Sequence, residues 1–340
     1  MNERIRGKTV LVTGGAGSIG RVLVRELLQQ GPRAVRVLDS HEHSLYQVGQ
    51  ELAGDDRVRY LLGDVRDVNR MRRAVEGTQV VYHAAAYKHV PILEYNPFEA
   101  VSTNVNGTQN VVDVALEQEV ERVILISTDK AVHPVNTMGA TKLLAEKIVI
   151  DANYYRGAKS TTFCCVRFGN VANSDGSVIP LFFRQIQRGG PVTVTDKEMT
   201  RFMVSVVEAV RLVIKATALM EGGEVFILKM KAMKIADLAH VMIEELAPRY
   251  GFSPDKIGIH YVGVRPGERI HESLLTQEES AHVREQEDML VAIPQLGVPQ
   301  GLTDRRLATA KPIGETSFIS DPALMNREEI SALLRKIGVV

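Results

Sequence analysis

Asp129 and Lys130 are adjacent residues of opposite charge that directly follow an apolar run at 123–127 typical of a buried strand. Ligands of α/β proteins bind at the carboxyl ends of such strands. In a closed apolar site, burial raises the pKa of an Asp and lowers that of a Lys, so Asp129 could donate a proton and a neutral Lys130 could accept one. The alternative is a structural ion pair in which both groups stay charged. The two residues alone leave both interpretations open.

A glycine motif lies near the N-terminus, where Gly14, Gly17 and Gly20 recur between a strand-like run at 9–12 and a helical pattern. In dinucleotide-binding proteins the first glycine permits a tight turn, the second lets the backbone approach a pyrophosphate, and the third allows close packing of helix and strand. The N-terminus of the helix then faces the phosphates. The motif therefore predicts a dinucleotide site; the alternative is an ordinary tight turn.

Asp39 ends the second predicted strand at the distance from this motif where dinucleotide-binding proteins carry an acidic residue. A carboxylate accepts hydrogen bonds from an unphosphorylated ribose and repels a 2′-phosphate, so NAD is favoured over NADP. Arg36 and His41 lie nearby and could compensate a 2′-phosphate. Asp64 follows the third strand and either meets the adenine or caps the strand end.

Short apolar runs alternate with helical patterns in the first half of the chain, at 9–12, 35–38, 59–62, 80–83, 123–127 and 162–166. This alternation predicts an α/β fold with a doubly wound parallel sheet. Gly, Pro and Ser then become frequent, which indicates a smaller, partly interleaved substrate-binding domain. We expect an NAD(P)-binding domain at 1–170 plus about 203–230, and the substrate-binding domain at about 171–202 and 231–340. Helices are expected at 205–220 and 326–336.

The charge balance excludes several classes of partner, because 41 Lys and Arg residues equal 41 Asp and Glu residues. Neither nucleic acid nor an anionic membrane is expected to bind, whereas a small anionic ligand is compatible. The only cysteines, Cys164 and Cys165, are neighbours in an apolar run and are expected to be reduced core residues. No signal peptide, spanning segment or metal-site spacing is recognisable, so we expect a cytoplasmic protein without a metal.

Further motifs make the sequence similar to a known family. Together with the glycine motif, Asp64-Val65, His83-Ala84-Ala85-Ala86, Asn104 and Ser127-Thr128-Asp129-Lys130 resemble the extended short-chain dehydrogenase/reductases, which have a Rossmann-type fold. A narrower resemblance, over residues 8–274, is to the UDP-N-acetylglucosamine 4,6-dehydratases. It is carried by Lys88-His89-Val90-Pro91, Asn96-Pro97, Ser127-Thr128-Asp129-Lys130-Ala131-Val132, Met138-Gly139-Ala140-Thr141-Lys142, Arg167-Phe168-Gly169-Asn170-Val171 and Arg265-Pro266-Gly267-Glu268.

The resemblance implies a reaction in which carbon 4 of the sugar is oxidised, water leaves across carbons 5 and 6, and carbon 6 is reduced. Asp129 is then the acid for the carbon 6 hydroxyl and Lys130 the base for the carbon 5 proton. In the wider superfamily a Tyr stands where this chain has Met138, four residues before Lys142 on one helical face. Met cannot transfer a proton, so Thr128, or Asp129 acting through it, would receive the carbon 4 hydroxyl proton. A branch of the sugar dehydratases resembles this sequence in carrying Met there.

The resemblance also implies binding residues. Lys142 would hold the nicotinamide ribose, and Lys88 would lie between nicotinamide and sugar. The other dinucleotide contacts would be Gly14, Gly17, Ser18, Ile19, Gly20, Asp39, Asp64, Val65, Ala84 and Ala85. The nucleotide sugar would contact Lys88, Asn170, Val178, Thr195, Arg265 and Glu268. Alternatively, Met138 fills a gap in the core, Lys142 is a solvated helix charge, and Arg265 and Glu268 form a salt bridge within a turn.

Three other functions stay open at this stage. A UDP-N-acetylglucosamine 4-epimerase would share the cofactor and the oxidation at carbon 4, but needs no acid–base pair at carbons 5 and 6. A second kind of 4,6-dehydratase also inverts carbon 5. A non-catalytic dinucleotide sensor is favoured by the missing Tyr and opposed by Asp129, Lys130 and Lys142. We expect the protein to bind a UDP-sugar and to form a homo-oligomer.

Overall fold

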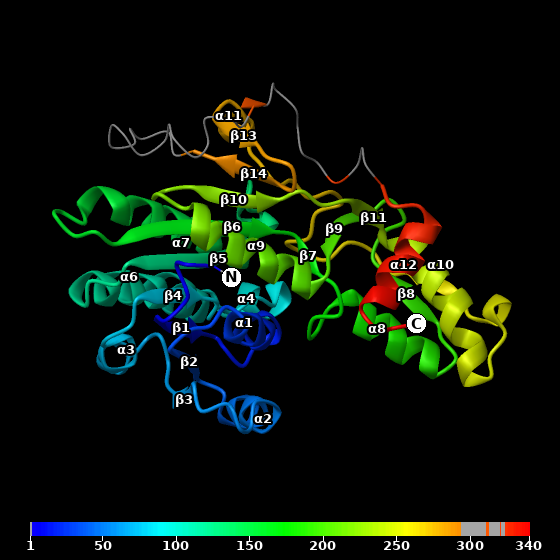
Figure 1. Cartoon of the computed structure of the whole chain (residues 1–340). Coiled ribbons are helices and arrows are strands. Elements are labelled where there is room, and N and C mark those ends of the chain that lie inside the picture. The colour runs from blue at the N-terminus through cyan, green and yellow to red at the C-terminus, as the bar shows by residue number, and fades with distance from the viewer. Residues whose placement is uncertain (1, 294–310, 313–319, 321–323) are drawn as a thin grey trace.

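A ten-stranded sheet forms the centre of the protein in the computed structural model, which describes residues 2–293, 311–312, 320 and 324–340 (Figure 1). All the strands expected from the apolar runs are present: β1 (Thr9–Thr13), β2 (Ala34–Asp39), β3 (Val58–Leu62), β4 (Val80–His83), β5 (Arg122–Thr128) and β6 (Thr162–Phe168). With β10 (Val225–Leu228) they pair in parallel in the order β10-β6-β5-β4-β1-β2-β3. The predicted parallel sheet is confirmed.

Three further strands extend this sheet beyond β10 through antiparallel pairs. They are β14 (Met289–Ala292), β13 (Val283–Glu285) and β15 (Lys311–Pro312). These strands come from the stretch 231–340 that we expected in the smaller domain. The proposed domain boundaries stay a prediction.

Helices cover both faces of the sheet, because each turns an apolar stripe toward it. On one face the core is shared by α1 (Ser18–Leu28), α2 (Glu42–Glu51) and α9 (Val206–Leu219). On the other face it is shared by α3 (Val68–Val75), α6 (Gly107–Glu117) and α7 (Thr137–Tyr155). Helix α9 confirms the helix expected at 205–220; Ser205 and Glu208 form its capping box, and it packs beside α1. The predicted double winding is therefore confirmed.

A smaller group of elements has its own core and lies at the right of the molecule in Figure 1. One sheet contains β7 (Asn170–Val171), β9 (Thr200–Val204) and β11 (Ala232–Lys234), and another contains β8 (Val192–Val194) and β12 (Ile259–Tyr261). The helices are α8 (Val178–Gln187), α10 (Ile235–Leu246) and α12 (Arg327–Lys336), the last confirming the expected C-terminal helix. Short helices elsewhere are α4 (Val90–Tyr95), α5 (Pro97–Ala100) and α11 (Gln277–Ser280), with a π-helical segment at Val101–Asn106.

A buried ion-pair network fixes the carboxyl end of β6 against the segment after β12. Arg167 is 1% exposed and donates to Glu146 of α7 and to Glu279 of α11 at 2.7–3.1 Å. It also donates to the carbonyl of Leu274 at 2.9 Å. Because an unpaired charge in this position would be costly, residues 274–279 are held close to β6.

The structure also bears on two expectations from the composition, which concern the state of the cysteines and membrane-spanning segments. Cys164 and Cys165 are buried thiols of β6 that form no disulfide, as predicted. Within the described ranges, no helix combines the length and the apolar character needed to cross a membrane.

Candidate acid–base site

Asp129 occupies a buried position where β5 ends and a short 3-10 turn begins. It is 1% exposed, and its Oδ1 accepts hydrogen bonds from Thr128 Oγ1 at 2.9 Å and from Lys130 Nζ at 3.1 Å. Its Oδ2 has no donor among the described residues. A Cβ added at Gly169 would lie 3.3 Å from this oxygen, so the glycine lets the chain after β6 pass close to the carboxyl. The structure therefore brings the predicted pair together and leaves one buried oxygen of Asp129 available.

A second buried carboxylate, Glu272, completes the cluster and was not predicted from the sequence. Its Oε1 lies 2.7 Å from Lys130 Nζ and 3.3 Å from Arg201 Nε of β9. Its Oε2 accepts from Asn170 Nδ2 at 2.9 Å, and Asn170 Oδ1 lies 3.3 Å from Lys130 Nζ. Because Glu272 follows Asn170 by 102 residues in the chain, no local spacing could have revealed the contact.

These contacts separate the pKa values of the two carboxyl groups. Burial raises the pKa of Asp129 to about 7, and the negative charge of Glu272 adds to this effect. Burial acts in the same direction on Glu272, but the positive charges of Lys130 and Arg201 outweigh it and hold that pKa at about 2. Near neutral pH one proton is therefore shared by the two groups, mainly on Asp129.

Of the two interpretations that the sequence left open for Lys130, the ligand-free structure favours the one in which Lys130 stays charged. Burial does lower the pKa of Lys130, but Asp129 and Glu272 together raise it above the ordinary value. Lys130 is thus an ammonium held between two carboxyl groups. Asp129 is its neighbour in the sequence, whereas Glu272 is brought to it by the fold.

Met138 and Lys142 lie on the same face of α7, four residues apart, as expected. Met138 is buried and belongs to a small apolar cluster with Leu93 and Ala100. Lys142 is also buried, and its Nζ donates to the carbonyl of Ile126 in β5 at 2.7 Å. Burial lowers the pKa of Lys142 to about 8. Lys142 is therefore not the solvated helix charge that was the alternative interpretation.

The glycine motif forms a close turn against the end of β4. Gly14 has φ +63°, and a Cβ there would lie 2.7 Å from the backbone of Ala85. At Gly20 a Cβ would lie 2.1 Å from the carbonyl oxygen of Gly14. Gly17 precedes the first residue of α1, Ser18, and no side chain caps this helix end. The turn thus leaves the N-terminus of α1 accessible to an anionic group.

Asp39 lies beside this turn, whereas Arg36 is bound elsewhere. The carboxylate of Asp39 accepts from the backbone amides of Ala16 at 3.0 Å and His41 at 2.9 Å. The guanidinium of Arg36 donates to the carbonyls of Ala74 and Glu76 at 2.7 and 2.6 Å, at the C-terminal end of α3. The acidic residue is therefore positioned at the turn without a contact to this arginine.

Asp64 is paired within its own loop. Its Oδ2 lies 2.7 Å from an Arg66 guanidinium nitrogen, and this hydrogen bond lowers its pKa. The next residue, Val65, is buried against Gly107 of α6. Asp64 thus has the contacts of a strand-end residue, and its role toward adenine stays a prediction.

The residues expected to contact a nucleotide sugar lie in several separate parts of the structure. Asn170 belongs to the acid–base cluster, while Lys88 Nζ donates to the carbonyl of Asp175 at 2.8 Å. Arg265 is exposed, and its backbone amide, not its guanidinium, donates to Glu268 at 3.4 Å. The turn salt bridge between these two residues is not formed in the described structure. The others lie at the start of α8 and after β8, at Val178 and Thr195.

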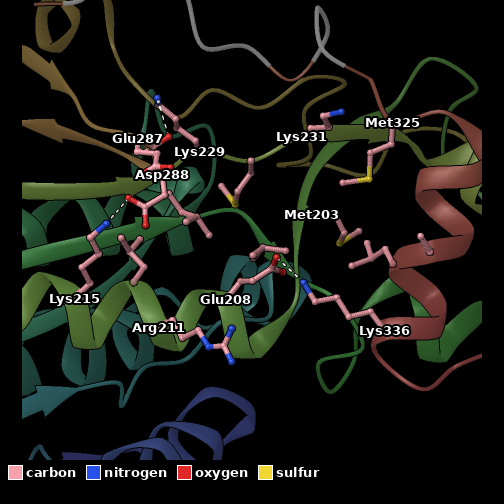
Figure 2. Close-up of a pocket in the computed structure, with 16 residues that line it drawn as sticks. Met203, Glu208, Arg211, Lys215, Lys229, Lys231, Glu287, Asp288, Met325 and Lys336 are labelled. Atoms are coloured by element: carbon pink, nitrogen blue, oxygen red, sulfur yellow. Dashed lines mark hydrogen bonds and ion pairs between the residues drawn. The ribbon is translucent and has the colours of Figure 1, made fainter. Parts of the chain in front are cut away.

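A separate pocket of about 640 Å³ contains none of these residues (Figure 2). It lies between α9, the ends of β9 and β10, and α12, and its floor includes Met203 and Met325. Figure 2 shows two of its lysines, Lys215 and Lys336, paired with Asp288 and Glu208. The pocket is therefore distinct from the acid–base cluster.

The parallel sheet, the glycine turn before α1 and the helices on both faces define a Rossmann-type α/β protein. The chain belongs to the polysaccharide biosynthesis protein family, whose model matches residues 10–294.

Proteins of similar sequence have been given several different names. The chain is 51% identical over 333 residues to an uncharacterized membrane protein of Methanocaldococcus jannaschii, covering 98% of this chain and 97% of that protein. It is 38% identical over 292 residues to a UDP-N-acetylglucosamine 4,6-dehydratase (inverting) of Campylobacter jejuni, covering 85% and 84%. It is also 38% identical over 278 residues to a UDP-glucose 4-epimerase of Rickettsia rickettsii, covering 81% and 79%.

A longer relative and a solved structure are also similar to this chain. The chain is 45% identical to the capsular polysaccharide biosynthesis protein CapD of Staphylococcus aureus, over 82% of this chain. It spans only about half (47%) of the length of that protein. Pen from Bacillus thuringiensis has a similar structure, with a TM-score of 0.90, 40% identity and 98% coverage of both chains.

The carboxyl of Asp129 should titrate near pH 7 in the ligand-free protein, protonated below and ionised above, because burial and Glu272 both favour the protonated form. ¹³C NMR of the aspartate carboxyl carbons, assigned with Asp129→Asn, would measure this pKa. A transition near pH 4, as in an ordinary Asp, would contradict the described environment.

Proposed function

We propose that this protein is a nucleotide-sugar 4,6-dehydratase that converts UDP-N-acetylglucosamine to a UDP-4-keto-6-deoxy-N-acetylhexosamine, using bound NAD. The observation that carries the proposal is a buried carboxyl of pKa about 7, Asp129, hydrogen-bonded to Lys130 at the carboxyl end of β5. A general acid works best when its pKa lies near the working pH. Loss of the carbon 6 hydroxyl as water requires such an acid.

The residues at the glycine turn fit a dinucleotide. Gly14 and Gly20 have no room for a Cβ, and the uncapped N-terminus of α1 suits a pyrophosphate. Asp39 would accept from the ribose hydroxyls, and Lys142 would hold the nicotinamide ribose. When bound, the nicotinamide would oxidise carbon 4 and later reduce carbon 6.

Proton movements can be assigned to three side chains at the end of β5. Thr128 Oγ1 donates to Asp129 Oδ1, so a proton from the carbon 4 hydroxyl would pass through Thr128 to an ionised Asp129. Asp129 would then give this proton to the carbon 6 hydroxyl, which leaves as water. Lys130 would take the carbon 5 proton and return it to carbon 5; it must first lose its ammonium proton, since the ligand-free protein holds that proton firmly.

Met138 and the exposed Arg265 complete the assignment. Met138 is buried and has no group that could transfer a proton, so at the position where a Tyr would act as base it would offer the sugar only an apolar contact, and the role of base would pass to Thr128 and Asp129. Arg265, on an exposed turn, would bind the diphosphate together with Lys88. The expectations of a cytoplasmic location and a homo-oligomer stay predictions.

The alternative is a UDP-sugar 4-epimerase, which the name of the Rickettsia relative favours. An epimerase requires no acid at carbon 6, so this reaction would not explain why the pKa of Asp129 is raised. The name of the Campylobacter relative favours a third outcome, dehydration with inversion of carbon 5.

Product mass separates these functions. Incubation of the protein and NAD with UDP-N-acetylglucosamine should give a product lighter by one water, and Asp129→Asn should lower its rate of formation by about 10²–10⁴-fold, the usual contribution of a general acid. NMR of the product then gives the carbon 5 configuration. An epimerised product of unchanged mass would overturn the proposal, and an intact sugar would leave only a dinucleotide sensor.

Cofactor choice gives an independent prediction. NAD should bind more tightly than NADP, because Asp39 would face the 2′-phosphate, and Asp39→Ala should narrow the ratio of Kd values about tenfold, or about 1.4 kcal/mol. Calorimetric titration of both cofactors measures this ratio. Arg36→Gln is the matched control and should leave it unchanged, because Arg36 is bound to the C-terminal end of α3. A wild-type preference for NADP would refute this reading of Asp39.

A further inference from the structure

Glu272 is held beside the proposed catalytic pair by more contacts than a single ion pair with Lys130 would require. It is 5% exposed and binds Lys130, Arg201 and Asn170 through both carboxylate oxygens. A carboxylate placed only to balance one lysine would not need two further donors. The geometry fixes which oxygen faces Lys130 and which faces Asn170.

The backbone of Glu272 is also clamped. Its amide donates to Ser320 Oγ at 2.9 Å, and its carbonyl accepts from the amide of Ser320 at 2.8 Å. Ser320 Oγ in turn lies 2.7 Å from Thr200 Oγ1 at the start of β9. With Arg167 holding Leu274 and Glu279, the segment has little freedom to move away from Lys130.

Glu272 changes the charge that both members of the pair experience. Its anion lies 2.7 Å from the Lys130 ammonium, and acts on Asp129 as a like charge. A nearby anion raises the pKa of a carboxyl group and of an ammonium group alike, since it disfavours a second negative charge and favours a positive one. Glu272 therefore shifts the protonation of both groups in the same direction, in addition to burial for Asp129 and to the charge of Asp129 for Lys130.

We infer that Glu272 is the positioning residue of the acid–base site: it orients the Lys130 side chain and adjusts how strongly Asp129 and Lys130 hold their protons. This inference rests on the proposed function for its kinetic consequences but not for its electrostatic ones. Glu272 does not need to touch the sugar for this role. Its effect reaches the substrate through Asp129 and Lys130.

The test compares Glu272→Gln with Glu272→Asp. Glu272→Gln removes the charge and should move the acidic side of the pH profile of kcat, where Asp129 and Lys130 each lose a proton, to lower pH by about one unit, which is a tenfold change in each protonation equilibrium. Glu272→Asp keeps the charge and should leave the acidic side near its wild-type position, although kcat falls. Loss of kcat at all pH values with an unmoved acidic side in Glu272→Gln would show a merely structural role and overturn the inference.

Glu279→Gln is the matched control. It removes another largely buried carboxylate of the same segment, one that pairs with Arg167 and not with Lys130. Its pH profile should keep the acidic side of the wild type whatever its effect on stability. A shift equal to that of Glu272→Gln would mean that any disturbance of this segment changes the site.

The same inference can be tested without a substrate. In the ligand-free protein, ¹³C NMR should place the Asp129 carboxyl transition at lower pH in Glu272→Gln than in wild type or Glu272→Asp. If wild type fails to dehydrate the sugar but this shift is found, the proposed reaction is wrong and the role of Glu272 stands. An unchanged transition in folded Glu272→Gln would overturn that role.

Discussion

An ammonium group enclosed by two buried carboxyl groups is the interaction on which the site depends. Lys130 cannot neutralise both Asp129 and Glu272, so the cluster retains a proton near neutral pH. Arg201 and Asn170 decide which of the two carboxyl groups carries the negative charge, because both bind Glu272. The consequence is an ionised Glu272 and a protonatable Asp129 with one free oxygen.

The fold brings these groups together from distant parts of the chain. Asp129 and Lys130 follow a central strand of the parallel sheet, whereas Asn170 and Arg201 belong to the small sheet formed by β7, β9 and β11. Glu272 lies on the segment fixed by Arg167 and Ser320. A site assembled in this way depends on the contact between the large sheet and the smaller group of elements.

The sequence could predict the features that depend on neighbouring residues, but not those that depend on contacts between distant residues. The strands from β1 to β6 and helix α9 were predictable, because their apolar periodicity and capping residues are encoded in consecutive positions. The Asp129–Lys130 contact was predictable for the same reason. Glu272 was not, although its charge adds to that of Asp129 in raising the pKa of Lys130, because this contact joins residues far apart in the chain. The contacts of Arg36 with the C-terminal end of α3 were equally hidden.

The central claim is that the Asp129–Lys130 cluster eliminates water from a transiently oxidised sugar. UDP-N-acetylglucosamine deuterated at carbon 4 tests this most directly, with the label located by NMR after turnover by the wild-type protein. The account predicts that deuterium appears at carbon 6 of a 4-keto-6-deoxy product. Deuterium kept at carbon 4 with inverted configuration would contradict it and identify an epimerase.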